Sequence, residues 1–275
     1  MIEKASWNFA EGDEIVPGRR AVRNLGGGTA FEVYLAWDEQ RLSFVACKLL
    51  RPDQVADARA LRQLRRESSL LARLVHPVIV RSLGATVEGP RPHLLLEHLN
   101  KRTLRRRLRR RGPLPLERVL PLALHLGAAL HYLSTESVVH LDIKPSNIVL
   151  GAPPRLIDFS IARTLERARR IQRPVGTANY MAPEQCAPGE RGEIGSAADV
   201  WGFGVTLYEA LSGRLPFPEG AGKSAPDASA RYPQLVTDPA PLQGDLPAAL
   251  GEIVMQCLSR ESATRPTARE LVATL

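Results

Sequence analysis

The chain has 275 residues, 44% of them hydrophobic, and a net charge of +8 from 37 basic and 29 acidic residues. It is long enough to bury one large core or two smaller ones, and no run of eighteen apolar residues predicts a membrane span. The first residues lack an apolar signal core, and Cys47, Cys186 and Cys257 form neither a disulfide framework nor a metal-type spacing. We therefore expect a cytoplasmic protein.

The basic residues are mostly arginine. Lysine occurs only at positions 4, 48, 101, 144 and 223, which leaves 32 arginines (37 − 5). Because arginine is so strongly preferred, each position that carries lysine is notable. Where lysine persists, the position favours a compact ammonium group over a planar guanidinium.

The first third of the chain predicts mainly strands. Residues 1–17 lack periodicity and are expected to form a loosely held N-terminal extension. Phe31–Ala36 and Phe44–Leu49 are strand-like, and the polar residues Asp38–Arg41 between them predict a hairpin. His93–Leu96 is a further short apolar strand.

Between these strands, residues 57–75 predict a helix. Its apolar stripe is formed by Leu61, Leu64, Leu71 and Val75. Glu67 falls on the same stripe, and a carboxylate on a buried face needs a cationic partner. The alternative is that Glu67 lies at the edge of the stripe in water.

The rest of the chain predicts mainly helices. The expected helices are Leu116–Leu133, Asp199–Leu211, Ala248–Leu258 and Thr267–Leu275, and the expected short strands are Val138–His140, Ile148–Leu150 and Leu156–Ile157. Residues 214–247 contain seven prolines and predict a long surface loop. Strands followed by helices indicate two α+β lobes that meet near residues 97–100.

Two features of the strand region suggest phosphate binding. Leu25-Gly26-Gly27-Gly28 precedes a strand, and glycines let backbone N–H groups approach phosphates, although three glycines more often make an ordinary turn. Lys48 ends an apolar strand, where a solvated edge residue is the usual finding. It lies 19 residues before Glu67 (67 − 48), and each of the two supplies the charge that the other needs.

The segment His140–Asn147 combines three chemically useful side chains in a short loop. Asp142 can orient and deprotonate a hydroxyl, Lys144 can neutralise a phosphate, and Asn147 can ligate Mg²⁺. Asp158 ends an apolar strand eleven residues later and adds a second carboxylate. Each residue alone has an ordinary loop explanation, but their joint order and spacing favour phosphoryl transfer from Mg²⁺–ATP.

Over roughly residues 20–275, these motifs resemble a eukaryotic-type bacterial serine/threonine protein kinase domain. The matching segments are Gly26–Val33, Lys48 with Glu67, His140–Asn147, Asp158–Ser160, Ala182–Glu184, Asp199–Gly202 and Arg265. The resemblance implies a two-lobed α+β fold with a β-rich N-lobe of about residues 18–97, carrying one regulatory helix. A larger helical C-lobe of about residues 100–275 would complete a kinase domain of residues 18–275.

The resemblance also implies roles for single residues. The ATP-binding residues would be Leu25, Gly26, Gly27, Gly28, Val33, Ala46, Lys48, Glu97, Leu99 and Val149, with Leu96 as gatekeeper. The catalytic residues would be Lys48, Glu67, Asp142 and Lys144, and the Mg²⁺ ligands Asn147 and Asp158. The Lys-Pro-Ser-Asn run and Gly176-Thr177 favour Ser/Thr of a protein substrate as acceptor, with autophosphorylation.

Three positions depart from the family pattern. Phe31 replaces the third loop glycine, where its ring would either cover the phosphates or stiffen the loop. Ser160 replaces the glycine after Asp158-Phe159 and restricts the backbone. Leu141 replaces the arginine that usually meets a phosphate on the activation loop. We therefore expect a loop that is held by other contacts, with constitutive or partner-controlled activity.

These departures keep a pseudokinase open as an alternative: a scaffold that retains the fold and perhaps the nucleotide. A small-molecule phosphotransferase is a second alternative, which Ala182–Glu184 and Arg265 disfavour because they build a peptide platform.

The arginine run Lys101–Arg111 predicts a short helix that packs through Leu104 and Leu108. A solvated helix in an arginine-rich protein is the simpler interpretation, and an acidic partner at Arg102–Arg111, anionic lipid or nucleic acid are the sharper ones. No aromatic interleaving supports nucleic acid. The sequence leaves the oligomeric state open.

Overall fold

The computed structural model describes residues 5–222, 225, 227–244 and 246–275. The chain forms two compact units that divide between Asn100 and Lys101. The first unit contains β1 (Glu14–Val16), β2 (Arg19–Gly27), β3 (Phe31–Asp38), β4 (Ser43–Leu50), α1 (Ala58–Arg73), β5 (Ser82–Thr86) and β6 (His93–Glu97). The mixed α+β character expected from the sequence is confirmed.

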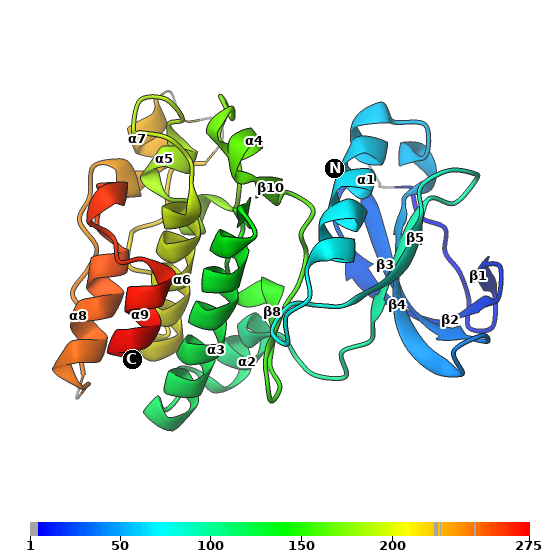
Figure 1. The fold of residues 1–275 in the computed structure, drawn as a ribbon, viewed down its shortest axis with the longest axis horizontal. Coiled ribbons are helices and arrows are strands. Elements are labelled where there is room, and N and C mark those ends of the chain that lie inside the picture. Colours follow the sequence, from blue (N-terminus) through cyan, green and yellow to red (C-terminus); the bar gives the residue numbers. More distant parts are fainter. Residues whose placement is uncertain (1–4, 223–224, 226, 245) are drawn as a thin grey trace. The chain divides into compact units, whose positions relative to one another are not determined.

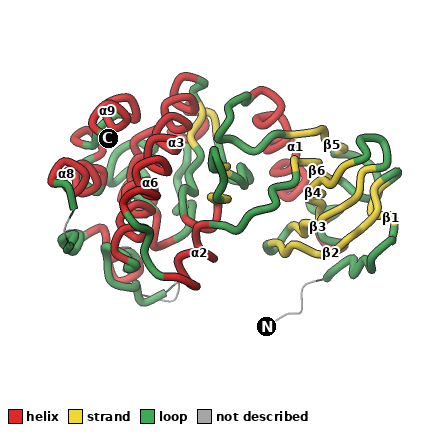
Figure 2. The backbone as a smooth tube through the Cα atoms, turned by 90° about the horizontal axis from the view of Figure 1, so that it is seen from below, coloured by secondary structure: helices red, strands yellow, loops and turns green. Residues whose placement is uncertain are grey.

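The strands of the first unit form one antiparallel sheet in the order β1-β2-β3-β4-β6-β5 (Figure 2). The expected hairpin is β3–β4, and Asp38 closes its turn by accepting from the backbone N–H groups of Gln40 and Arg41. Because side chains alternate along a strand, Val45, Cys47 and Leu49 of β4 line one face of the sheet, and Ala46 and Lys48 line the other.

The N-terminal segment packs against the face that carries Cys47. Trp7 and Phe9 stack on each other and join the apolar cluster there, and the Trp7 indole donates to the Leu50 carbonyl at 2.7 Å. The guanidinium of Arg91 lies over both rings, 5.3 and 5.0 Å from their centres. Trp7 and Phe9 are therefore attached to the sheet, whereas a loosely held extension was expected for residues 1–17; residues 1–4 lie outside the described part.

Helix α1 supplies most of the expected amphipathic stripe, but Val75 lies beyond the last residue of the helix, Arg73, and is 82% exposed. Asp57 caps its start by accepting from the Ala60 N–H at 2.6 Å, as is typical of Asp at a helix N-cap. Leu64, Leu70 and Leu71 are buried along the stripe, and so is Glu67. The placement of Glu67 in water is thus wrong for this helix.

The second unit is mainly helical. Its helices are α2 (Leu104–Arg111), α3 (Leu116–Thr135), α4 (Leu165–Arg169), α5 (Pro183–Cys186), α6 (Ser196–Ser212), α7 (Ala228–Arg231), α8 (Ala248–Cys257) and α9 (Ala268–Thr274). Its strands are β7 (Val138–Val139), β8 (Ile148–Val149), β9 (Arg155–Leu156) and β10 (Arg163–Thr164). Helices α3, α6, α8 and α9 pack side by side (Figure 1), and α6 is buried along nearly its whole length, as its apolar sequence predicted.

The proline-rich segment 214–247 is only partly the expected surface loop. It contains α7 and a 3₁₀ turn, Pro233–Leu235, in which Gln234 and Leu235 are buried. The amide of Gln234 donates to the carbonyls of Ala178 and Met181. Residues 223, 224, 226 and 245 of this segment, Pro226 among them, lie outside the described part.

Among the helices of the described ranges, none combines the length and the apolar character that a membrane span requires.

Candidate active site

Lys48 and Glu67 form a buried ion pair in the first unit. The Lys48 ammonium lies 2.8 Å from both oxygens of the Glu67 carboxylate, and the two side chains are 8% and 0% exposed. Burial strengthens such an attraction and makes the loss of one partner costly. The pairing expected from the sequence is present, and it fixes the ammonium at the face of the sheet that α1 covers.

The glycine loop lies on the same strands. Gly26 pairs with Val33, which in turn pairs with Lys48 across β3 and β4. The loop needs glycine at position 27, because a Cβ atom there would lie 2.2 Å from the Phe31 carbonyl oxygen. The Phe31 ring lies against the Lys48 ammonium, with its centre 4.9 Å away, and is 6% exposed.

Strand register determines the positions of the other residues in this unit that are expected to bind nucleotide. Ala46 pairs with Leu96 across β4 and β6, and Glu97 ends β6. Leu99 lies just beyond it and is partly buried, while Leu25 on β2 is 39% exposed. Val149 belongs to the second unit, where it pairs with Arg155 in a two-stranded ladder.

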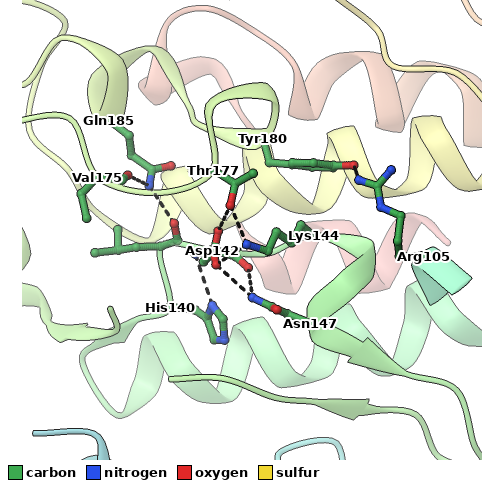
Figure 3. A network of polar contacts seen from close by, with 10 residues as sticks. Arg105, His140, Asp142, Lys144, Asn147, Val175, Thr177, Tyr180 and Gln185 are labelled. Atoms are coloured by element: carbon green, nitrogen blue, oxygen red, sulfur yellow. Dashed lines mark hydrogen bonds and ion pairs between the residues drawn. The ribbon is translucent and has the colours of Figure 1, made fainter. Parts of the chain in front are cut away.

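Asp142 is the centre of a polar cluster in the second unit (Figure 3). Its Oδ2 lies 2.7 Å from the Lys144 ammonium and 3.0 Å from the Asn147 amide nitrogen. Its Oδ1 accepts from the Thr177 hydroxyl at 2.7 Å, and the Thr177 oxygen accepts in turn from Lys144 at 2.5 Å. The segment His140–Asn147 therefore brings together the three side chains that the sequence singled out.

A carboxylate of α6 holds the backbone of the two residues that precede Asp142. Asp199 accepts the N–H groups of His140 and Leu141, each at 2.7 Å. Burial raises the pKa of Asp199 to about 7, against the two hydrogen bonds, which lower it. Burial likewise lowers the pKa of His140, so its neutral ring can accept the Asp142 N–H at Nδ1, 3.3 Å away.

Asn147 and Asp158 are the two residues that the sequence singled out as metal ligands. The Asn147 amide nitrogen donates to the carbonyl and the carboxylate of Asp142, so its amide oxygen points away from Asp142. Asp158 adopts a left-handed φ of +65°, which is unusual for a residue with a side chain and marks a constrained position. In the described part of the chain, no three His, Cys, Asp or Glu side chains form a metal cluster on their own.

The segment after Asp158 is tied to the loop His140–Asn147 by strand pairing and by hydrogen bonds between protein groups. Strand β10 pairs with β7, directly before His140. The amide of Gln185 donates to the carbonyls of Leu141 and Val175, both at 2.9 Å (Figure 3). Leu141, which stands where an arginine was expected, is 3% exposed.

Glu184 and Arg265 form a second buried pair, with both side chains 0% exposed. Arg265 donates to the two Glu184 oxygens at 2.6 and 2.8 Å, and its remaining N–H groups reach the carbonyls of Ala197, Ser259 and Arg260. Only the five-donor fork of arginine can satisfy all these acceptors at once. The pairing expected from the sequence is thus present.

A further polar cluster was not predicted from the sequence. Arg105 of α2 donates to Glu209 of α6 at 3.0 Å and to the Tyr180 hydroxyl, and Tyr180 donates to the second Glu209 oxygen at 2.5 Å. The missed signal was Glu209, a carboxylate among the buried residues of α6, as Glu67 is among those of α1. The cluster ties α2 to the segment that carries Thr177.

A small antiparallel sheet with a buried Lys–Glu pair, and a helical unit with an Asp–Lys–Asn–Thr cluster, together define the protein kinase class. The model of the protein kinase domain family matches residues 19–275, and the chain belongs to this family. The resemblance inferred from the motifs is therefore confirmed.

Among curated proteins, the chain is 32% identical to the serine/threonine-protein kinase pkn2 of Myxococcus xanthus, over 95% of this chain and 32% of that protein. It is 32% identical to PknB of Mycobacterium leprae, over 91% of this chain and 41% of that protein. It is 34% identical to PkaA of Streptomyces coelicolor, over 82% and 41%. The chain thus spans about a third to two fifths of the length of these relatives.

Proposed function

We propose that this chain transfers the γ-phosphoryl group of Mg²⁺–ATP to Ser and Thr hydroxyls of proteins, itself included. The observation that carries the proposal is the set of contacts around Asp142. An ionised carboxylate offers about four acceptor positions. Lys144, Asn147 and Thr177 occupy three of them, two on Oδ2 and one on Oδ1. One position on Oδ1 is left to accept a substrate hydroxyl.

In this proposal Asp142 orients the acceptor hydroxyl and takes its proton at Oδ1. Lys144, which is fixed by Asp142 and Thr177, balances negative charge beside the reacting oxygen. Lys48 binds phosphate oxygens, and Glu67 keeps its ammonium in place. Such catalysis consists almost entirely of positioning and charge stabilisation.

Asn147 and Asp158 are the proposed Mg²⁺ ligands. Mg²⁺ prefers oxygen and is usually bound by one or two carboxylates together with substrate phosphates, so two protein ligands are a suitable number. The orientation of the Asn147 amide supports this, because its nitrogen is used by Asp142. When bound, the metal ion would neutralise charge on the phosphates.

A protein substrate is favoured over a small molecule. The buried Glu184–Arg265 pair fixes the segment that follows Thr177, and Gln234 holds the carbonyls of Ala178 and Met181. These contacts stabilise an ordered surface beside Asp142, such as an extended peptide needs. The curated relatives are named serine/threonine-protein kinases, which supports the same acceptor class.

We further propose that the activation segment needs no phosphate. Leu141 cannot bind one, and β10, Thr177 and Gln185 already hold the segment. The cytoplasm, where ATP is available, is the proposed location. The three cysteines are buried and unpaired, in keeping with a reducing compartment.

The test is incubation of the chain with Mg²⁺ and γ-labelled ATP and a generic basic protein, followed by phosphoamino acid analysis. We expect label on Ser and Thr of both proteins, and a loss of about 10³-fold or more in Asp142→Asn. Equal labelling by the native chain and the variant would instead support the pseudokinase alternative, for which Phe31, packed on Lys48, is the most specific observation.

A further inference from the structure

Helix α2 carries a concentration of positive charge that the fold leaves largely uncompensated. Its sequence is LRRRLRRR, with no acidic residue. Arg105 is bound to Glu209 and Tyr180, and Arg107 donates to the Gly112 carbonyl. The remaining basic residues of the run are exposed and, within the described residues, have no ion-pair partner: Lys101, Arg102, Arg106, Arg109, Arg110 and Arg111.

Three of these residues form a stripe on the outer face of the helix. At about 100° per residue, Arg106, Arg109 and Arg110 lie within an arc of about 100°, opposite Leu104 and Leu108. The two leucines are 0% and 7% exposed and anchor the helix to the unit. We call Arg106, Arg109 and Arg110 the arginine stripe.

The positive charges of the arginine stripe are balanced only in part within α2. Like charges three and four residues apart, as in Arg106–Arg109 and Arg106–Arg110, repel each other. Arg106 lies in the first turn, where the helix dipole disfavours positive charge, whereas Arg109 and Arg110 lie in the last turn, where the dipole favours it. No acidic side chain of α2 balances the remaining positive charge, which is therefore available to a partner outside the helix.

We infer that the arginine stripe is a docking surface for an acidic protein segment. From Arg106 to Arg110 the helix rises about 6 Å. Acidic residues at alternate positions of an extended peptide are separated by about 6–7 Å, so two of them can face the stripe together. Guanidinium groups pair with carboxylates through two parallel hydrogen bonds, which suits arginine better than lysine.

Other classes of partner fit less well. A membrane-binding helix exposes apolar side chains beside its charges, whereas both leucines of α2 are buried. Single-stranded nucleic acid is bound through aromatic stacking, and α2 has no aromatic residue. The inference concerns binding alone and does not depend on the proposed kinase activity.

The test is fluorescence anisotropy of a labelled peptide in which glutamate alternates with glycine, with the glutamine version as the neutral control. We expect the native chain to bind the acidic peptide, with an affinity that falls as salt rises, and to ignore the neutral one. Replacing all three stripe residues by glutamine should weaken binding about tenfold. Replacing them by lysine should weaken it less, because the charge remains.

The matched control is Arg118→Gln/Arg191→Gln/Arg269→Gln, which removes the same charge from exposed, unpaired positions of the same unit. It should change binding less than twofold. Equal weakening in the control and the stripe variant would overturn the inference, because net charge would then explain the binding. Tighter, stripe-dependent binding to phosphatidylserine vesicles or to duplex DNA than to the acidic peptide would overturn it in favour of those partners. Circular dichroism of each variant checks the fold, and Asp142→Asn should bind the peptide like the native chain.

Discussion

Thr177 shows at the scale of one residue how a hydroxyl can order a catalytic carboxylate. It donates to Asp142 and accepts from Lys144, so it links the two groups that the mechanism needs. A side chain without the hydroxyl removes the Thr177 hydrogen bond to Oδ1 of Asp142 and leaves Lys144 without one acceptor.

We therefore expect Thr177→Val to lower kcat about 10²-fold with a small change in KM for ATP. Thr177→Ser keeps the hydroxyl and should retain most of the activity. Steady-state kinetics of the two variants checks this, and a valine variant as active as the serine variant would rule out the role.

The protonation of the Asp199 carboxyl group should affect the free energy of unfolding. Burial raises its pKa to about 7 in the folded chain, against an ordinary value of 3.8. Between these values the folded chain binds a proton that the unfolded chain has released. The contribution of Asp199 to the free energy of unfolding should therefore decrease as the pH rises from about 4 to about 7.

Asp199→Asn should remove this contribution, so that the native and variant curves are not parallel between pH 5 and 7. Urea unfolding at several pH values measures the difference, whose slope is at most about 1.4 kcal/mol per pH unit. Asp53→Asn, in an exposed turn, is the control. Parallel curves for Asp199→Asn would show that its pKa is ordinary.

At the scale of elements, the N-terminal segment is part of the first unit, although the family match begins only at residue 19. The backbone N–H of Trp7 donates to the buried carboxylate of Glu32 on β3, and the indole N–H donates to the carbonyl of Leu50 at the end of β4. These strands also carry Val33 and Lys48. The segment thus supports the sheet that presents the ammonium.

Trp7→Ala should lower the free energy of unfolding by about 2–4 kcal/mol, because it removes a packed ring and a hydrogen bond. Trp7→Phe should cost about 1 kcal/mol, the value of the hydrogen bond alone. Glu11→Ala, at an exposed position of the same segment, should change little. Denaturant unfolding of the three variants checks the order, and an unchanged Trp7→Ala would show that the segment contributes nothing.

Elements with a strong apolar periodicity, or with a buried charge that needs a partner of opposite sign, could be predicted from the sequence. The stripe of α1 placed Glu67 on a buried face, and the need for a cation pointed to Lys48. Residues 5–17 could not be assigned, because Trp7 and Phe9 pack through contacts with Leu50 and Arg91, far away in sequence. No local pattern encodes such contacts.

The cluster of Arg105, Tyr180 and Glu209 was missed for a related reason. Its members are separated by 75 residues between Arg105 and Tyr180 and by 29 between Tyr180 and Glu209, so only the fold brings them together. The cluster around Asp142 was easier, because Lys144 and Asn147 are its sequence neighbours.

At the scale of the whole molecule, the chain keeps the chemical groups of its family and changes the residues beside them. Leu141 directly precedes Asp142, Ser160 follows Asp158 by two residues, and the Phe31 ring lies against Lys48. Contacts between protein groups of the second unit hold the segment 158–184. We propose that the polar cluster around Asp142 in the second unit is already ordered in the unphosphorylated chain.

The most direct test is the rate of phosphoryl transfer by chain that has been freed of phosphate by a phosphatase, which is then removed. Thr164→Ala with Ser160→Ala, treated alike, controls for rapid rephosphorylation, and Asp142→Asn sets the background. We predict an immediate linear rate, of the order of 1–100 per second for a good substrate, in the native chain and in the double variant. A lag that ends only as the segment 158–184 is phosphorylated would show that the segment needs a phosphate. A double variant no faster than Asp142→Asn would show the same.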